Sequence, residues 1–505
     1  MILAPARARR KLAYPTGHRQ FAPGPGVAAK GRIWAEIGVL QLAPKCSTFL
    51  LALLVFAIPI EHKYAKLFRH FSLTFIPEGL IFPRSFDKKI YFYASDIAAI
   101  LLFAAALFAF RIPLRRLFLE RGTPYLWLFF ACSLLSVLVS PLATYPVIYT
   151  RFFQLLAPIF LFSYLAHCLP KENQTKLLFS VLIAAALLQS AIATLQYFTQ
   201  SPLGLHILGE PKQATGALGV DGGYRWLFDS LFHQARSTNT VIRSCGTLPH
   251  CNVLGGFLAL SLLATYSLIV SLPSNWLRRL LGLSLIVQFF ALCISYSRSA
   301  IFAWAIGTVF WFGYSVYHRG FRDVFGDRAT RFLASMILVA VAINTTLLFD
   351  QLLHRGGIFN YNGLAKGSDD FRIGMHNLTY KIIEDHPLIG VGFQQFSSGA
   401  AAYLPPGTRP SGVHNIYLFL AAETGLISLA AFLGFIIALI VAGFRAPCSP
   451  RLASLLAMFI GLLFIGGCDY YLILFQQGRL MFFCVAGLLA AEGVFARRRG
   501  EIITL

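Results

Sequence analysis

Histidine and arginine side chains at the ends of long apolar runs are the residues of this chain that could do chemistry. His414 and Asn415 stand directly before such a run in SGVHNIYLFLAAETGLISL, residues 411–429. An imidazole titrates near neutral pH and can accept a proton from a sugar or serine hydroxyl. His414 is therefore a candidate general base, and the competing interpretation is a histidine that caps or anchors the start of a helix. Glu423 lies on roughly the opposite helical face from His414, so we expect it to bond another helix.

Several arginines near the ends of apolar runs are candidate anion-binding residues. The planar guanidinium binds phosphate oxygens in pairs, so arginines that converge on one outer cavity predict a phosphate or pyrophosphate site. Arg372 and Arg479 have an equal alternative, because arginines near the ends of membrane helices often extend toward lipid headgroups. The candidates are Arg151, Arg243, Arg298, Arg372 and Arg479.

Two further stretches place polar side chains beside apolar runs. His250 and Asn252 enter a run in IRSCGTLPHCNVLGGF, after Pro249, which suits the first turn of a helix. The N-terminus of such a helix has unpaired N–H groups and a positive dipole, and both favour an anion. Asp469, in GGCDYY, is a weaker candidate for contact with a substrate or a lid. We expect His250, Asn252, Asn415 and Asp469 to be either acceptor-binding or structural.

The composition indicates that membrane-spanning helices position these residues. The chain has 505 residues, of which 57% are hydrophobic and 13% charged, whereas soluble domains carry about 25% charged residues. Its apolar runs approach the ~20 residues that a helix needs to cross a bilayer, and no alternating strands of a membrane barrel are visible. The sequence predicts an all-α, polytopic integral membrane protein with about 12 transmembrane helices. The predicted spans are about 45–60, 94–112, 124–140, 146–168, 176–199, 250–272, 277–295, 299–317, 332–350, 415–444, 452–468 and 479–496.

The distribution of basic residues predicts the orientation. The net charge is +22, and the basic residues are scattered over short loops. Cytoplasmic loops of membrane proteins carry such an excess of lysine and arginine. We therefore do not predict nucleic-acid binding. Both termini are expected in the cytoplasm, with a basic, disordered leader over 1–45 and a tail over 497–505. The predicted helices occupy 46–350 and 415–496, and the long outer loops are 61–93, 200–249 and 351–414. His414 then faces outward.

The third outer loop contains a predicted amphipathic helix near the membrane surface, which could act as a lid. Asp369 and Asp370 suit its first turn, and Pro387 and Gly390 would end it. Its apolar face has three- and four-residue spacing. That face consists of Phe371, Met375, Leu378 and Ile382.

The cysteines do not predict a metal or redox centre. The chain has 9 cysteines without metal-type spacing, and we predict neither a metal nor a cofactor. Cys245 and Cys251 could form a disulfide if both lie outside the cytoplasm, and two free thiols are equally compatible with the sequence. No internal repeat of the kind found in many transporters is visible.

Four stretches, in this order and with this topology, resemble the O-antigen ligase and polymerase superfamily. The resemblance covers about residues 90–495. A cysteine stands in PHCN where many members have proline. The stretches are GTLPHCNVLGGF, SYSRSAIFAW, DHPLIGVGFQQF and HNIYLFLAAETGLISL.

The resemblance implies a membrane glycosyltransferase that uses neither ATP nor metal. It implies transfer of O-antigen from undecaprenyl diphosphate to lipid A–core, at the periplasmic face of the bacterial inner membrane. By this resemblance His414 is the catalytic base and Arg298 binds the diphosphate, whereas Arg151 and Arg243 rest on their predicted placement. Membrane lipids are the other expected partners.

Two alternatives stay open. The same family includes O-antigen polymerases and protein O-oligosaccharyltransferases, which differ in the acceptor, and the ligase is favoured by analogy with the large outer loop between the ninth and tenth spans. A transporter with about twelve spans would instead place paired charges and broken helices near the middle of the membrane.

Overall fold

A computed structural model gives the structure of the chain. The chain divides into two compact units, Met1–Cys46 and Ser47–Leu505, and the second unit contains every candidate site residue. The leader as far as residue 38, most of the first outer loop and the C-terminal tail after residue 498 lie outside the described residues. The described residues are 39–60, 93–140, 149, 152–168, 172–211, 217–219, 240–356, 364–405 and 412–498.

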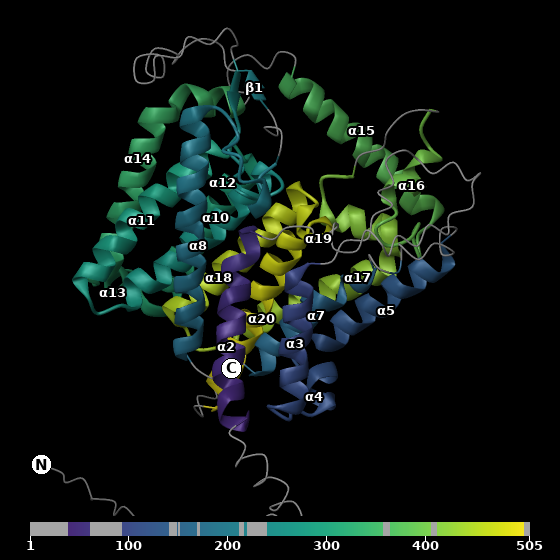
Figure 1. Ribbon diagram of the computed structural model, residues 1–505, viewed down its shortest axis with the longest axis horizontal. Coiled ribbons are helices and arrows are strands. Elements are labelled where there is room, and N and C mark those ends of the chain that lie inside the picture. The colour runs from purple at the N-terminus through teal and green to yellow at the C-terminus, as the bar shows by residue number, and fades with distance from the viewer. Residues whose placement is uncertain are drawn as a thin grey trace, which may run out of the picture. The chain divides into compact units, whose positions relative to one another are not determined.

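Helices make up almost all regular structure of these residues, so the prediction of an all-α membrane protein is confirmed. The only strands among the described residues are β1 (Ala217–Gly219) and β2 (Thr240–Ile242), which pair antiparallel. Two 3-10 turns are η1 (Ile58–Ile60) and η3 (His206–Leu208). The helices (Figure 1) are α2 (Val39–Ala57), α3 (Ala94–Phe108), α4 (Leu114–Leu119), α5 (Thr123–Val139), α7 (Leu156–Cys168), α8 (Glu172–Thr199), α10 (Cys251–Ser271), α11 (Asn275–Ile294), α12 (Arg298–Arg319), α13 (Phe321–Gly326), α14 (Arg328–Gly356), α15 (Leu364–Asp385), α16 (Phe396–Ala401), α17 (Ile416–Phe444), α18 (Pro450–Cys468), α19 (Tyr471–Leu474) and α20 (Gln476–Arg498).

Many of these helices are suited to a membrane. Within the described residues, 7 helices are long and apolar enough to cross a bilayer, and α2, α3, α5 and α7 contain shorter apolar helices. Each predicted span overlaps a described helix, while the number of crossings and the side of the termini stay predictions. The long apolar helices are α8, α10, α11, α12, α14, α17 and α18.

Helix α10 lies inside the bundle, packed against α8, α11, α12 and α18 (Figure 1). Glycines allow the backbones to approach closely, as is common between membrane helices. A Cβ at Gly255 of α10 would lie 2.8 Å from the Cβ atoms of Ser297 and Ala300 at the start of α12. A Cβ at Gly307 of α12 would lie 3.1 Å from the carbonyl oxygen of Ala457 in α18. The close approach at Gly255 brings the starts of α10 and α12 together, and the one at Gly307 brings α12 against α18.

Helix α17 is interrupted near its start. Gly425 has φ 82° and ψ 169°, a backbone conformation that glycine adopts readily and other residues rarely do. The break leaves backbone groups of α17 without intrahelical partners, and the preceding loop satisfies them. Val391 donates its N–H to the carbonyl of Ala422 at 2.9 Å, and Leu426 donates to the carbonyl of Pro387 at 2.8 Å. The DHPLIGVG segment of the outer loop therefore docks into a membrane helix.

The side chain of Glu423, at this break, is hydrogen-bonded to the same loop. It accepts the backbone N–H of Gln394 at 2.7 Å and that of Phe396 at 2.9 Å. Its backbone carbonyl accepts the hydroxyl of Ser136 in α5 at 2.6 Å. The expectation that Glu423 bonds another helix holds for its carbonyl, whereas its side chain bonds the loop and the start of α16. An acceptor for these N–H groups stabilises the loop, because buried donors without a partner are costly.

The predicted amphipathic helix of the outer loop is α15, but it begins earlier than expected. It starts at Leu364, so the placement of Asp369 and Asp370 in the first turn was wrong. Its first three residues, Leu364, Ala365 and Lys366, are strong helix formers, so the chain does not need an acidic N-terminal turn to start it. The helix ends at Asp385, before Pro387, as expected.

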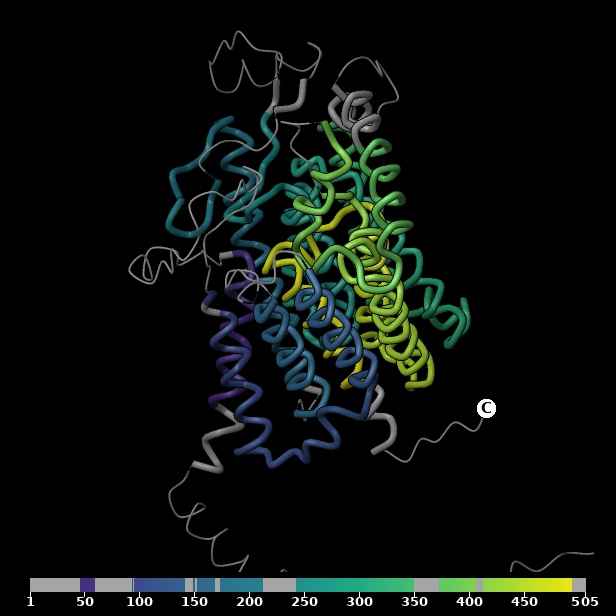
Figure 2. Tube along the Cα trace, turned by 90° about the vertical axis from the view of Figure 1, so that its right-hand side faces the viewer, coloured from purple at the N-terminus to yellow at the C-terminus, as the bar shows by residue number. Residues whose placement is uncertain are grey.

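The apolar face of α15 is buried against neighbouring elements. Met375, Leu378 and Ile382 form a second apolar cluster together with Val413 and Phe419, at the start of α17. The side chain of Phe371 lies outside the described residues. Figure 2 shows α15 (green) beside α17 (yellow-green). This packing brings the outer loop over the segment that carries His414.

Candidate functional site

The ends of three helices meet beside His414. Asn252, in the first turn of α10, donates its side-chain N–H to Asp469 Oδ2 at 2.6 Å, and Asp469 follows the last residue of α18. Asn415, directly before α17, donates its amide to the carbonyl of Gly467 at 3.3 Å. The starts of α10 and α17 are therefore bonded to the end of α18.

A chain of polar contacts links His414 to Arg243. The Nδ1 of His414 lies 3.4 Å from Asp469 Oδ1, long for a hydrogen bond and short enough for an ion pair when the ring is protonated. The other oxygen of Asp469 accepts from Asn252, whose own Oδ1 accepts from Arg243 Nη2 at 2.6 Å. Residues that are far apart in the sequence thus form one cluster, which we call the His414 cluster: Arg243, His250, Asn252, His414 and Asp469.

Arg243 is fixed to the turn that precedes α12. Its Nε donates to the carbonyl of Ser295 at 3.0 Å, and its Nη2 to that of Tyr296 at 3.4 Å. Tyr296 has φ 50°, an uncommon conformation that turns the chain between α11 and α12. Arg298 begins α12 two residues later, is partly buried, and lies at the same end of the bundle. Two of the predicted arginines thus share one turn.

The N-cap of α17 is Asn415, not His414. The Asn415 side chain accepts the N–H groups of Tyr417 at 2.9 Å and Leu418 at 3.1 Å, as asparagine does at helix starts. The interpretation of His414 as the capping residue is therefore wrong, whereas an anchoring role for it stays open beside that of a base. That ring packs edge-on against Tyr470, with 4.9 Å between centroids.

The position of Asp469 favours its charged form. Burial by itself would raise the pKa of this carboxyl, but the neighbouring His414 ring, the amide of Asn252 and the backbone N–H of Tyr470 outweigh burial and lower the pKa below its usual value. Asp469 is therefore a carboxylate at neutral pH. A carboxylate beside the Nδ1 of a histidine orients the ring and stabilises the imidazolium that forms when the ring takes a proton.

His250 is held neutral. Burial lowers the pKa of this imidazole to about 4, and the positive charge of Arg243 acts in the same direction. Its Nδ1 accepts the backbone N–H of Asn252 at 3.0 Å, which caps α10. A neutral ring is required for this bond, because a protonated imidazole has no acceptor. The contacts of His250 favour the structural alternative over acceptor binding.

Helix α15 adds two more side chains to the surroundings of His414. The guanidinium of Arg372 acts electrostatically on His376 and on Cys468, the neighbour of Asp469. The charge of a protonated His414 also acts on His376. Sequence reasoning selected Arg372 but not His376, although the two are spaced to share a helix face.

The two remaining arginines differ from this set. Arg479 is 1% exposed and donates to the carbonyl of Ile473 at 3.1 Å and to Gln476 Oε1 at 2.7 Å. Gln476 in turn donates to Asp96 of α3 at 2.7 Å, so these bonds favour a packing role. Arg151 lies outside the described residues.

Two of the cysteines lie close to Arg243. Cys245 and Cys251 are buried and are not joined by a disulfide, and their sulfurs lie 3.5 and 3.7 Å from the carbonyl oxygen of Arg243. Among the described residues, no group of three or more His, Cys, Asp or Glu side chains could hold a metal ion.

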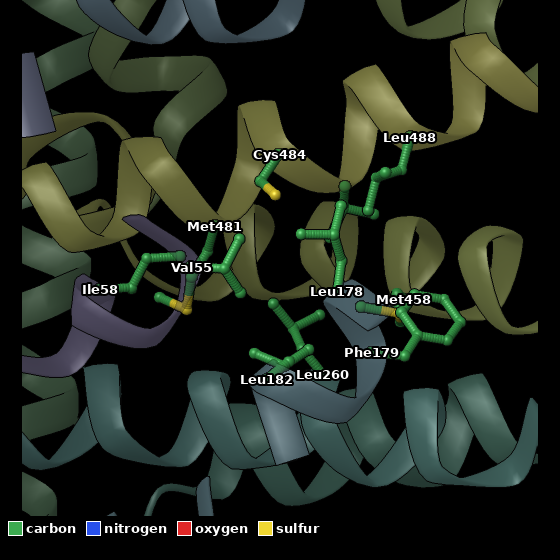
Figure 3. A pocket seen from close by; sticks show the side chains of 11 residues that line it. Val55, Ile58, Leu178, Phe179, Leu182, Leu260, Met458, Met481, Cys484 and Leu488 are labelled. Carbon is green, nitrogen blue, oxygen red and sulfur yellow. The ribbon is translucent and has the colours of Figure 1, made fainter. Parts of the chain in front are cut away.

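An apolar cavity of about 30 Å³ lies deeper in the bundle, between α2, α8, α10, α18 and α20 (Figure 3). Its lining includes Leu178, Leu260, Met458 and Met481. Leu260 is two turns along α10 from Asn252, roughly 12 Å at 1.5 Å per residue. None of the described residues that line this cavity is charged, so it is separate from the His414 cluster and offers no acid–base chemistry.

Comparison with known proteins bears on 151 of the 505 residues, in a segment that follows α10. Residues 283–433 match a protein-family model described as O-antigen ligase. The matched segment runs from α11 into α17 and contains Arg298, Arg372, His376 and His414. No curated protein matches the chain. This family indicates a function of the O-antigen ligase or polymerase type, on polysaccharide and lipid substrates. Residues 283–433 of this multi-pass membrane protein are thus similar to the O-antigen ligase family.

Proposed function

We propose that the chain is an O-antigen ligase that transfers O-antigen polysaccharide from undecaprenyl diphosphate to a sugar hydroxyl of lipid A–core. The observation that carries the proposal is the His414 cluster, in which a histidine with a buried carboxylate on one ring nitrogen is joined through Asn252 to an arginine. The family match supports the glycan substrate. A base and an anion-binding cation in one site suit attack by a hydroxyl on a sugar diphosphate.

In the proposed reaction, His414 is the base. With Nδ1 facing Asp469, Nε2 on the other side of the ring takes the proton of the acceptor hydroxyl. The hydroxyl oxygen forms a bond to the anomeric carbon of the donor sugar, and the bond from that carbon to the diphosphate oxygen breaks. The electron pair of that bond leaves with the lipid diphosphate. A single displacement inverts the anomeric carbon, and Asp469 stabilises the imidazolium.

The diphosphate is assigned to the arginines. Arg243 and Arg298 lie on either side of one turn, beside the N-termini of α10 and α12. Charge that develops on the leaving group is stabilised by guanidinium groups and by the positive ends of helix dipoles. Arg372, on α15, and Arg479, which is only 1% exposed, are retained as weaker candidates.

Loss of the base is the direct test. Membranes containing His414→Ala should transfer glycan to lipid A–core about 10²–10⁴-fold more slowly than wild type, with binding of the lipid-diphosphate donor retained. His386→Ala, which alters an exposed histidine of the same outer loop, is the matched control and should keep full activity. Full activity of His414→Ala would refute the assignment.

The identity of the acceptor distinguishes an O-antigen ligase from an O-antigen polymerase and from a protein O-oligosaccharyltransferase. On a lipopolysaccharide gel, we expect a deletion strain to lack the ladder of capped lipopolysaccharide. Carrier-linked polymer should accumulate in the same strain. Single-repeat products would instead identify a polymerase. Unchanged lipopolysaccharide, together with loss of glycan from a pilin or another protein, would identify a protein O-oligosaccharyltransferase.

A further inference from the structure

A second histidine, His376 of α15, lies near the proposed base. Met375 of α15 and Val413 are buried in the same apolar cluster, and each directly precedes a histidine, His376 and His414. The charge of a protonated His414 acts on His376, so the two rings lie close enough to interact. His376 is partly buried and does not belong to the hydrogen-bonded chain that leads to Arg243.

Among the described residues, the Nε2 of His376 is an unsatisfied polar atom. This atom is buried and has no hydrogen-bond partner within the part of the chain that the structure describes. A buried polar atom without a partner destabilises a protein by about 1–3 kcal/mol, so such atoms are rare unless they serve another purpose. A bound hydroxyl would satisfy the nitrogen.

The charge of His376 indicates which substrate it suits. Burial lowers the pKa of this imidazole, and His414 and Arg372 lower it further, so the ring is neutral at neutral pH. A neutral imidazole can donate to or accept from a hydroxyl but adds no positive charge for a diphosphate, for which arginine is better suited.

The two ends of the site therefore differ in chemistry. Arg243 and Arg298, beside α10 and α12, form a cationic side. The α15 side presents the neutral His376, while Arg372 acts on Cys468, next to Asp469. His414 lies between the two, where the base must contact the acceptor hydroxyl that attacks the donor.

We propose that His376 binds a hydroxyl group of the acceptor sugar, so that the acceptor enters between α15 and His414 while the donor diphosphate lies on the side of α10 and α12. This inference rests on the proposed function and adds the location of the acceptor to it. Substitution of His376 should weaken acceptor binding selectively.

The experiment uses the full chain in lipid vesicles with a polyprenyl-diphosphate-linked glycan as donor and purified lipid A–core as acceptor. We expect His376→Ala to raise the KM for the acceptor on the order of tenfold, which is one lost hydrogen bond. The KM for the donor, and slow donor hydrolysis without acceptor, should stay at wild-type values. His376→Gln keeps a polar group and should recover most of the loss, and His386→Ala, on the exposed histidine of the same loop, should have no effect.

The kinetic constants of the variants distinguish acceptor binding by His376 from its other possible roles. A raised KM for the donor with an unchanged KM for the acceptor would overturn the inference and place His376 on the diphosphate side. Equal kinetics of His376→Ala and wild type would overturn it as well. A general fall in kcat, together with a lower melting temperature for both His376 variants, would show a structural role and also count against it. If the wild-type chain itself transferred no glycan from the lipid diphosphate to any acceptor, the proposed function would fail first, and this inference with it.

Discussion

At the residue scale, Asn252 is the side chain that holds the site together. Its amide N–H donates to Asp469 while its carbonyl oxygen accepts from Arg243. Asparagine can do this because its planar amide group carries both a donor and an acceptor. The residue therefore joins the proposed base, through Asp469, to a proposed diphosphate-binding arginine.

Substitution of Asn252 should disturb both partners. Asn252→Asp replaces the donor with a carboxylate beside Asp469, so we expect about 1–3 kcal/mol of lost stability and a transfer rate lower by at least tenfold. Thermal unfolding in detergent and the transfer assay measure the two effects. Asn377→Ala, on the exposed face of α15, is the control. Wild-type stability and rate in Asn252→Asp would show that the hydrogen-bonded chain contributes to neither.

The lowered pKa of His250 predicts how the free energy of unfolding depends on pH. Its pKa is about 4 in the folded protein and about 6.5 in an unfolded chain. Because the folded state binds the proton less well, the stability contribution is complete above about pH 6.5 and is lost as pH falls toward 4. His250→Asn keeps a good helix cap and removes this titration. Its melting temperature should therefore fall less than that of wild type between pH 6.5 and 4.5, and parallel curves would contradict the prediction.

At the element scale, the docking of the outer loop into α17 determines where His414 lies. The loop from Pro387 to Phe396 bonds the backbone around Gly425 and the carboxylate of Glu423. The same loop follows α15, whose apolar face packs beside Val413. The outer loop is thus part of the helical bundle, and α15 is positioned by it.

Gly390 tests this docking. It has φ 73°, and a Cβ there would overlap the backbone of Glu423, so Gly390→Ala should destabilise the protein by about 2–4 kcal/mol. Gly313→Ala in α12 is the matched control, because no atom lies within 4 Å of the added carbon, and it should be neutral or slightly stabilising. Melting temperatures in detergent measure both, and equal values would show that the loop is not tightly docked.

At the scale of the whole molecule, the proposal requires His414 to face the periplasm. His386→Cys lies in the outer loop and Arg322→Cys in α13, and both positions are exposed. A membrane-impermeant maleimide should label His386→Cys in intact cells, above the background of the native cysteines, and should label Arg322→Cys only after the cells are opened. The reverse pattern would invert the topology and end the proposal.

The charges inside the bundle argue against a transporter. Arg451 and Glu492 form a buried ion pair between α18 and α20, but Arg451 is the second residue of α18 and lies far from the middle of that helix. The break in α17 at Gly425 is filled by the backbone of Pro387 and Val391, so the groups it frees are already bonded. Neither feature provides an ion or substrate site at mid-membrane.

Much of the helical arrangement could be predicted from the sequence, because long apolar runs have few alternatives to membrane helices. The meeting of Asn252 with Asp469 could not, since their contact depends on how α10 and α18 pack. Gly425 carried no signal either, because its bonding partners lie in a loop and a glycine within an apolar run is compatible with an unbroken helix. His376 was missed because an isolated histidine on an amphipathic helix is usually exposed.

The break at Gly425 divides α17 into a short outer rod and a long inner one. The inner rod, Leu426–Phe444, spans roughly 28 Å, close to the ~30 Å hydrocarbon thickness of a bilayer. A membrane helix usually tilts in response to a thinner or thicker membrane, and we expect the loop that bonds both rods to resist this tilting at the glycine. The outer rod, tied to α18 by Asn415 and to the loop by Glu423, should then keep its direction. We therefore expect the imidazole at its tip to keep its place when lipid chain length changes.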